Sequence, residues 1–284
     1  DAHSNLGNIL KELGRSKEAE LSYRKAIEVK SDYADAHSNL GNILRELGNF
    51  EDAELSYLKA IELNPDLASV YFSLSLIKHS DTNQVWKNKL FSENIVNNKL
   101  KKDQIDIYFA RANVFHKEKN YKESSQCLEL ANKLKLKIRK SNPDRFLSKS
   151  KELLLELDKG EKNKKVYKKY PESIFIVGMP RSGSTLLESI LSMNNDVYDL
   201  GEINTLEESF IENKKNDQAL TLADIYFRKI RNYKNELNIS TNKWLYNYHY
   251  AGIIANQIPN AKIIHCFRNP LDNILSIYRA HFTS

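Results

Sequence analysis

The run Gly178-Met-Pro-Arg181-Ser-Gly183-Ser-Thr185 combines the residue types that bind a phosphate or a sulfate. An apolar segment precedes it and an amphipathic segment follows it, so we expect a loop between a strand and a helix. Successive N–H groups of such a loop and the positive end of the helix point at one anion. The glycines permit a tight turn, and the arginine adds a planar cation. The anion-binding candidates in this loop are Arg181, Ser182, Gly183, Ser184 and Thr185.

The loop departs from the nucleotide-triphosphatase pattern G-x-x-x-x-G-K-[ST] at one position. Ser184 stands where that pattern has lysine, and the positive charge lies earlier, at Arg181. The missing lysine disfavours binding of a β/γ-phosphate pair with magnesium, so a P-loop kinase is the least favoured interpretation. Arg181 remains suited to a single phosphate or a phosphate–sulfate bridge. The alternative is an ordinary strand–turn–helix junction that is rich in glycine and serine.

A second segment repeats this architecture. The residues from Lys262 to Phe267 predict a buried strand, Arg268 lies at its end, and Pro270 suits the first turn of a following helix. Ser276 follows Arg268 by eight residues, about two helical turns. Arg268 and Ser276 therefore predict a second anion site, near enough to Arg181 for one nucleotide to reach both. Alternatively, Arg268 is a surface salt-bridge residue and Ser276 only fills a helix position.

These two segments together resemble the 5′-phosphosulfate loop and the 3′-phosphate motif of sulfotransferases. The resemblance covers Ser173 to Ser284 and is greatest to bacterial sulfotransferases with tetratricopeptide repeats, then to protein-tyrosine sulfotransferases; Arg181 points away from cytosolic sulfotransferases, which usually carry lysine there. It implies an α/β, P-loop-like domain with a parallel sheet. It also implies transfer of a sulfuryl group from 3′-phosphoadenosine 5′-phosphosulfate (PAPS) to a hydroxyl or amine, without a metal ion. The 5′ end of PAPS would lie on the first loop and its 3′-phosphate on Arg268 and Ser276.

Two further residues acquire roles from the resemblance. Lys243, in Thr-Asn-Lys-Trp, matches a lysine that would stabilise charge on the bridging oxygen, although Trp-Leu follows it instead of the usual Met-Pro or Asp-Pro. Glu202 lies 21 residues after Arg181, the spacing of the catalytic base in protein-tyrosine sulfotransferases. Lys243 is otherwise a surface lysine, and Glu202 a capping or surface carboxylate. His249 and His265 are rival bases; we expect His265 to pack inside the buried strand, and His249 either to line a pocket or to pack among its aromatic neighbours.

The domains of this family continue well beyond the second motif, whereas the sequence ends at Ser284. The resemblance therefore predicts a sulfotransferase domain that is incomplete at its C-terminus, with weak or no turnover and an exposed sheet edge.

The N-terminal half contains an internal repeat. Residues 1–34 and 35–68 are identical at 24 of 34 positions without a gap, and they resemble two tetratricopeptide (TPR) repeats, which form an α-helical solenoid. Residues 69–141 predict two degenerate hairpins of the same kind. Asparagines recur on one face of the first helix and resemble the asparagine ladder of O-GlcNAc transferase repeats, which implies a peptide-binding groove; the alternatives are a solvated polar face or a dimer contact. They are Asn5, Asn8, Asn39 and Asn42.

Residues 142–172 predict a basic helical linker before the domain at 173–284. Between Lys133 and Tyr170 there are 14 Lys and Arg against 5 Asp and Glu, a surplus of nine in a chain whose net charge is +6. This charge either steers an anionic cofactor or acidic acceptor, or belongs to a solvated helix from Leu147 to Leu157 and a hinge from Gly160 to Tyr170. No motif that reads nucleic acid accompanies it, so we expect no nucleic-acid partner.

Composition limits the remaining possibilities. No apolar run is long enough to cross a membrane, and two distant cysteines, Cys127 and Cys266, predict no disulfide, which together favour a cytoplasmic protein. No metal-ligand spacing is present. The favoured function is a PAPS-dependent sulfotransferase acting on a protein or peptide, a glycan or a small alcohol, with TPR repeats that bind a protein. The alternative is a TPR scaffold with an inactive catalytic half.

Overall fold

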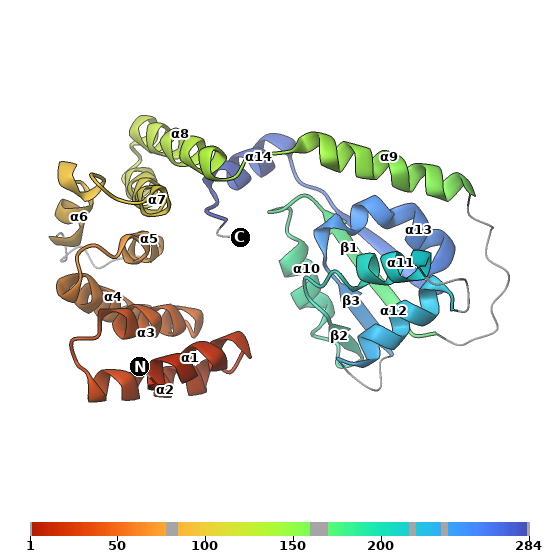
Figure 1. The fold of residues 1–284 in the computed structure, drawn as a ribbon, viewed down its shortest axis with the longest axis horizontal. Coiled ribbons are helices and arrows are strands. Elements are labelled where there is room, and N and C mark those ends of the chain that lie inside the picture. Colours follow the sequence, from red (N-terminus) through yellow and green to blue (C-terminus); the bar gives the residue numbers. More distant parts are fainter. Residues whose placement is uncertain (1, 78–84, 160–169, 216–219, 234–237, 283–284) are drawn as a thin grey trace. The chain divides into compact units, whose positions relative to one another are not determined.

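The computed structural model describes residues 2–77, 85–159, 170–215, 220–233 and 238–282. The chain folds as two compact units, Asp1–Ser141 with His281–Ser284, and Asn142–Ala280. The first unit is helical and the second contains a sheet (Figure 1). Among the described residues, every helix is too short or too polar to span a lipid bilayer.

Helical hairpins build the first unit, and neighbouring hairpins stack on one another as the repeat predicts (Figure 1). A 3-10 helix, η1 (Glu93–Ile95), lies between the sixth and seventh α-helices. The α-helices are α1 (Ala2–Glu12), α2 (Ser16–Val29), α3 (Ala34–Glu46), α4 (Phe50–Leu63), α5 (Ala68–Leu76), α6 (Val85–Leu90), α7 (Lys101–Lys117) and α8 (Tyr121–Ile138).

One glycine in each regular repeat allows its two helices to approach. A Cβ atom on Gly7 would lie 2.6 Å from the Tyr23 ring, and a Cβ on Gly41 would lie 2.6 Å from the Tyr57 ring. Both tyrosines are fully buried. Because no side chain fits between the ring and the facing helix, glycine at this repeat position sets the packing distance of the hairpin.

The second unit alternates strands and helices. Its four strands are parallel and lie in the order β2-β3-β1-β4. The elements are α9 (Pro143–Lys159), β1 (Glu172–Gly178), α10 (Ser184–Leu191), β2 (Val197–Asp199), α11 (Thr205–Lys215), α12 (Leu222–Arg231), β3 (Ile239–Asn242), the 3-10 helix η2 (Leu245–Tyr250), α13 (Ala251–Gln257), β4 (Ala261–Cys266) and α14 (Pro270–Arg279).

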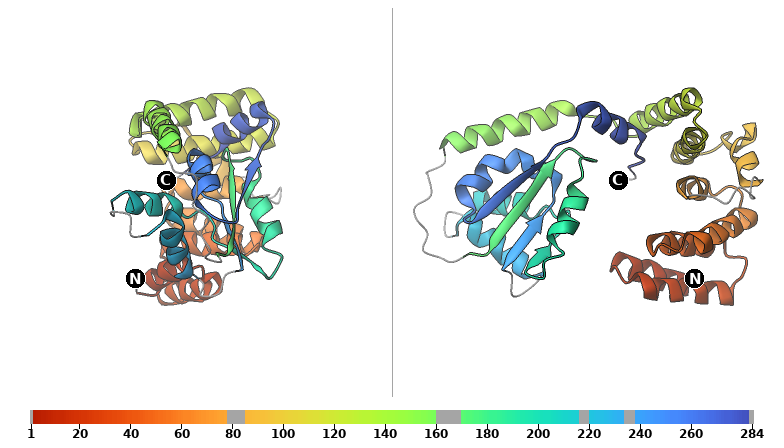
Figure 2. Two further views of the ribbon diagram at one scale, coloured as in Figure 1. Left: turned by 90° about the vertical axis from the view of Figure 1, so that its right-hand side faces the viewer. Right: turned by 180° about the vertical axis from the view of Figure 1, so that it is seen from behind.

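Helices cover both faces of the sheet (Figure 2). Helix α10 lies on one face, and α11, α12 and α13 lie on the other. The main core of the unit forms on the second face, where aromatic rings pack against β1. Its aromatic side chains are Tyr170, Phe175, Phe210, Tyr226, Phe227 and Tyr250. The parallel order and the two covering layers place every carboxyl end of a strand at one edge of the sheet, where such folds bind ligands.

Strand β4 corrects one expectation from the sequence. The segment does form a strand, but it is largely exposed, and His265 is exposed on it rather than packed in a core. β4 lies at the edge of the sheet, and the part of the chain that the structure describes pairs it with β1 alone. The apolar run Ile-Ile-His-Cys-Phe is typical of a strand buried on both faces; position in the sheet, which the run does not encode, decides its burial.

Helix α9 packs against α13 and η2 of its own unit. It contains the helix predicted from Leu147 to Leu157, and Leu153 belongs to the core of the unit. Lys149 forms an ion pair with Glu207 at 2.5 Å. The hinge predicted from Gly160 to Tyr170 lies outside the described residues except for Tyr170, which is buried.

Candidate anion-binding and catalytic site

The four strand ends bring the predicted site residues to one edge of the sheet. The loop 179–183 follows β1, Glu202 follows β2, Lys243 follows β3, and Arg268 follows β4. Backbone bonds tie two of these segments together, because the Lys243 N–H donates to the Gly201 carbonyl at 2.9 Å. Residues that lie up to 89 positions apart in the sequence therefore meet at this edge of the sheet.

The loop after β1 has the backbone conformation of an anion cradle. Gly183 has φ +99° and forms the N-cap of α10, so the following N–H groups lie at the positive end of that helix. Gly178 is required by close approach, because a Cβ there would lie 2.5 Å from the Cys266 carbonyl oxygen. The Ser182 hydroxyl is buried in the loop without a hydrogen-bond partner among the described residues. Ser184 is buried and Thr185 exposed at the start of α10.

The two predicted anion sites are adjacent. The Arg181 Nε donates to the Ser276 hydroxyl at 3.2 Å, and the Arg268 Nη1 donates to the Arg181 carbonyl at 3.4 Å. Both arginines are exposed, so their remaining N–H groups face solvent. These two hydrogen bonds join the segment after β1 to the segment that begins α14.

Lys243 connects the loop to Glu202. Its ammonium is 2.9 Å from the Glu202 carboxylate and donates to the Thr185 hydroxyl at 3.2 Å. The Lys243 side chain is 8% exposed and that of Glu202 57% exposed. A buried cation and an accessible carboxylate thus lie side by side, next to the anion loop. The alternative that Lys243 is an ordinary surface lysine is wrong, because its side chain is buried beside Thr185 and Glu202.

Glu188 is a site residue that the sequence did not reveal. It lies on α10, its carboxylate is 3.7 Å from the Lys243 ammonium, and it accepts a hydrogen bond from the Thr241 hydroxyl at 3.0 Å. Its side chain is only 7% exposed. Its position one helical turn after Ser184 was a weak signal; only the placement of β3 beside α10 shows its partner.

Asn273 on α14 is a second residue that the sequence did not single out. It is buried, and its Nδ2 donates to the Pro180 carbonyl at 2.8 Å. The helix begins as predicted, with Pro270 in its first turn, and the Asn269 side chain accepts hydrogen bonds from the N–H groups of Leu271 and Asp272. The spacing of the apolar residues in α14 indicates a buried face that does not include Asn273, so this pattern does not identify Asn273 as buried.

The rival base His249 lies in an aromatic cluster against α9. Its ring stacks on Phe146 and Tyr246, and its Nδ1 is 2.7 Å from the Ser150 hydroxyl. Burial and the neighbouring Lys149 ammonium lower the pKa of His249. Of the two possibilities that the sequence left open, packing among aromatic residues is therefore the one observed.

The asparagines of the predicted peptide groove are of two kinds: two accept a hydrogen bond from a buried tyrosine of their own repeat, and two do not. The hydroxyl of Tyr23 donates to Asn8 Oδ1 at 2.7 Å, and that of Tyr57 donates to Asn42 Oδ1 at 2.9 Å. Asn39 Nδ2 donates to the Asn8 Oδ1 of the preceding repeat at 3.4 Å. Asn5 is exposed. The repeat thus fixes Asn8 and Asn42 by their side-chain oxygens.

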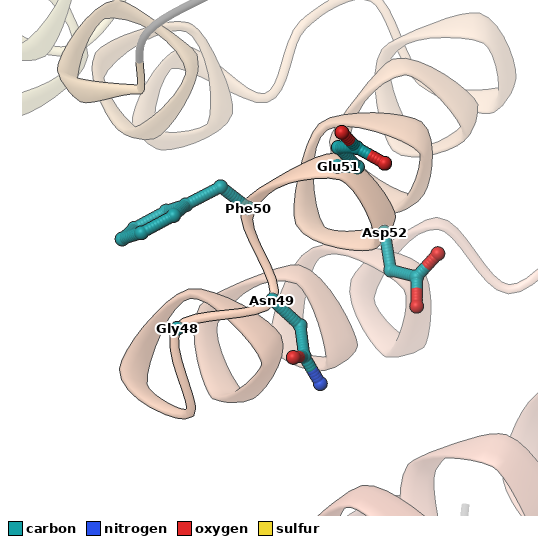
Figure 3. Close-up of a pocket in the computed structure, with 5 residues that line it drawn as sticks. All are labelled: Gly48, Asn49, Phe50, Glu51 and Asp52. Carbon is teal, nitrogen blue, oxygen red and sulfur yellow. The ribbon is translucent and has the colours of Figure 1, made fainter.

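A hollow of about 370 Å³ lies at the turn between α3 and α4, in the helical unit (Figure 3). It is lined by Gly48, Asn49, Phe50, Glu51 and Asp52. The Phe50 ring and the Asp52 carboxylate point in different directions. Because ligand sites are marked by polar groups that converge, this hollow has no feature of a catalytic site. Among the described residues, no group of three or more His, Cys, Asp or Glu side chains is arranged to hold a metal ion.

Family models match both units. Residues 171–284 match the model described as a sulfotransferase domain. Residues 7–44, 34–67 and 105–137 match three models described as TPR or tetratricopeptide repeats.

Two individual proteins are similar over part of their length. An uncharacterized protein of Aquifex aeolicus (strain VF5) is 32% identical over 131 residues, which cover 39% of this chain and 17% of that protein. The chain therefore spans less than a fifth of the length of the curated relative it matches. A Thermobaculum terrenum O-GlcNAc transferase mutant matches with a TM-score of 0.32 and 14% identity, over 90% of this chain and 44% of that one.

Proposed function

We propose that this chain, which joins tetratricopeptide repeats to a sulfotransferase domain, transfers a sulfuryl group from PAPS to a hydroxyl or amine of an acceptor. The acceptor is a protein or peptide, a glycan or a small molecule. The observation that carries the proposal is the hydrogen-bonded junction of Arg181, Arg268 and Ser276, which makes two predicted anion sites neighbours.

The residues present fit such a nucleotide. The Ser182 hydroxyl is a buried donor without a partner among the described residues, and a Cβ on Gly178 would lie only 3.1 Å from it. The donors are N–H groups, hydroxyls and guanidinium groups, which suit phosphate and sulfate oxygens. When bound, PAPS supplies the sulfuryl group and, in its bisphosphate part, the leaving group.

Each residue has a role that follows from its chemistry. The 5′ end of the nucleotide is held by Arg181, Ser182, Gly183, Ser184 and Thr185. Arg268 and Ser276 hold the 3′-phosphate. The Ser276 hydroxyl accepts from the Arg181 Nε and keeps its own O–H for a ligand anion, so Arg181 and Ser276 can act on one nucleotide together.

Glu202 and Lys243 are the proposed catalytic residues. Glu202 is exposed enough to reach an acceptor, and as a general base it takes the proton of the attacking hydroxyl or amine, which contributes about 10²–10⁴-fold. Lys243 stabilises negative charge that develops on the bridging oxygen. When Glu202 becomes neutral, the Lys243 ammonium still has the Glu188 carboxylate beside it and keeps its position.

The repeats provide the proposed protein-binding surface. Because the side-chain oxygens of Asn8 and Asn42 already accept tyrosine hydroxyls, their amide N–H groups are the donors that remain for a ligand. Together with Asn5 and Asn39 they would bind the carbonyl groups of an extended peptide. This supports delivery of a peptide acceptor or recruitment of a protein partner.

Isothermal titration of the chain with adenosine 3′,5′-bisphosphate and with ATP plus magnesium tests the proposal. We expect bisphosphate to bind more tightly, and Arg268→Ala to weaken it by about 10- to 150-fold through loss of one charge-assisted contact. Arg228→Ala is the matched control, since Arg228 is paired with Glu212 on other helices. Absence of any nucleotide binding would favour the inactive scaffold, and a preference for ATP with magnesium would favour a kinase.

A further inference from the structure

The residue that α14 buries is polar: it is Asn273. Asn273 is 5% exposed, whereas Leu271 and Ile274 beside it are 77% and 59% exposed. A buried amide is unfavourable unless it is hydrogen-bonded, so an apolar residue would be expected at this position if it served packing alone. The burial of asparagine points to the bond that its side chain makes.

The Asn273 hydrogen bond reaches the anion loop at the residue just before Arg181, which has a positive φ. Asn273 Nδ2 donates to the Pro180 carbonyl at 2.8 Å. The next residue, Arg181, has φ +67°, which is unfavourable for a residue with a side chain. The Arg181 carbonyl accepts from Arg268 Nη1 at 3.4 Å, so both carbonyl groups that flank the strained residue are bonded to α14 or to the segment leading into it.

The hydrogen bond to the Pro180 carbonyl also sets the direction of the Arg181 N–H group. The C=O and N–H of one trans peptide point in opposite directions. Fixing the Pro180 carbonyl toward α14 therefore turns the Arg181 N–H away from that helix. The loop conformation is thus imposed from α14, the helix that carries Ser276 of the other anion site.

We propose that Asn273 is a positioning residue that holds the 5′-anion loop in its binding conformation through the Pro180 carbonyl. The proposal rests on the nucleotide function proposed above and adds a residue that acts through the loop without touching the nucleotide. A preformed loop binds its anion without a cost of ordering. Loss of Asn273 therefore weakens ligands in proportion to their contact with the loop.

Isothermal titration of the full chain with three nucleotides separates this role from a general structural one. In Asn273→Ala we expect adenosine 3′,5′-bisphosphate and 5′-AMP to bind about 10-fold more weakly, the effect of one lost hydrogen bond with its acceptor left unsatisfied. 3′-AMP, which uses Arg268 and Ser276, should keep its affinity within about 2-fold. Ile274→Ala, at an exposed neighbouring position, should leave all three affinities unchanged.

Three outcomes would overturn the proposal. The first is a folded Asn273→Ala variant that binds adenosine 3′,5′-bisphosphate within about 2-fold of the parent affinity. The second is an Asn273→Ala variant that loses the same factor of affinity for 3′-AMP as for 5′-AMP. The third is a parent chain that binds none of the nucleotides, which also removes the proposed function; the first two leave that function intact. Should the alanine variant not fold, Asn273→Leu keeps nearly the same size, stays neutral and loses the N–H donor, and the same pattern is expected.

Discussion

Replacement of Lys243 by methionine tests whether two carboxylates hold this lysine. The variant keeps most of the aliphatic stem and removes the charge. The Lys243 ammonium lies 2.9 Å from the exposed carboxylate of Glu202 and 3.7 Å from the buried carboxylate of Glu188. The two pairs have different surroundings, so the structure predicts different energies for them.

The magnitude follows from burial. A pair with one exposed partner, such as Lys243 with Glu202, contributes about 0–1 kcal/mol because solvent screens it. A buried carboxylate that loses its cation costs about 3–5 kcal/mol. Glu188 keeps the hydrogen bond from the Thr241 hydroxyl, so we expect a value near the lower end, about 3 kcal/mol.

The two tryptophans of the chain provide the assay. In a Trp86→Phe background, Trp244, next to Lys243, is the remaining tryptophan and reports unfolding of the α/β unit in urea. We expect Lys243→Met to lower the free energy of unfolding by about 3 kcal/mol. Glu202→Gln should lower it by about 1 kcal/mol or less. Adding Glu188→Gln to Lys243→Met should restore most of the loss.

Two results would refute this reasoning. One is a small and equal loss in Lys243→Met and Glu202→Gln. The other is a double variant, Lys243→Met with Glu188→Gln, that is no more stable than Lys243→Met alone. Either result would mean that Glu188 does not interact with Lys243, and the proposed support of Lys243 during proton transfer would fail.

Three further outcomes are expected. Gly41→Ala should lower the free energy of unfolding of the repeats by about 1–2 kcal/mol, because overpacking against the buried Tyr57 ring outweighs the better helix propensity of alanine; unchanged urea midpoints would contradict this. Burial and Lys149 lower the pKa of His249, so the unfolded chain takes up a proton first and stability falls as the pH drops from about 7.5 through 6.5. His249→Gln should show a shallower fall in urea melts, and an unchanged slope would exclude His249 as its source. Burial raises the pKa of Cys266, so iodoacetamide should modify it more slowly in the folded chain than in urea at pH 8; equal rates measured by mass spectrometry would show that it is not protected.

Much of the site could be predicted because its parts are local. The glycines of the loop, Arg181 beside them and the proline that starts α14 define short segments whose backbone geometry depends on nearby residues. The expectation that these segments meet follows from parallel strands, whose carboxyl ends share one edge. The TPR fold of the N-terminal half could also be predicted, because the same pattern of residues occurs in two consecutive copies.

The sequence by itself predicted the two kinds of unit, the anion loop and the strand end at which Arg268 lies. Only the tertiary structure decided that β4 is the strand at an exposed edge, that Glu188 faces Lys243 and that Asn273 bonds to the Pro180 carbonyl. Local patterns specify backbone conformation and the period of apolar residues. Burial and long-range hydrogen bonds depend on which elements pack against each other. Pro180 and Asn273 lie 93 positions apart, and no local pattern in the sequence predicts their hydrogen bond.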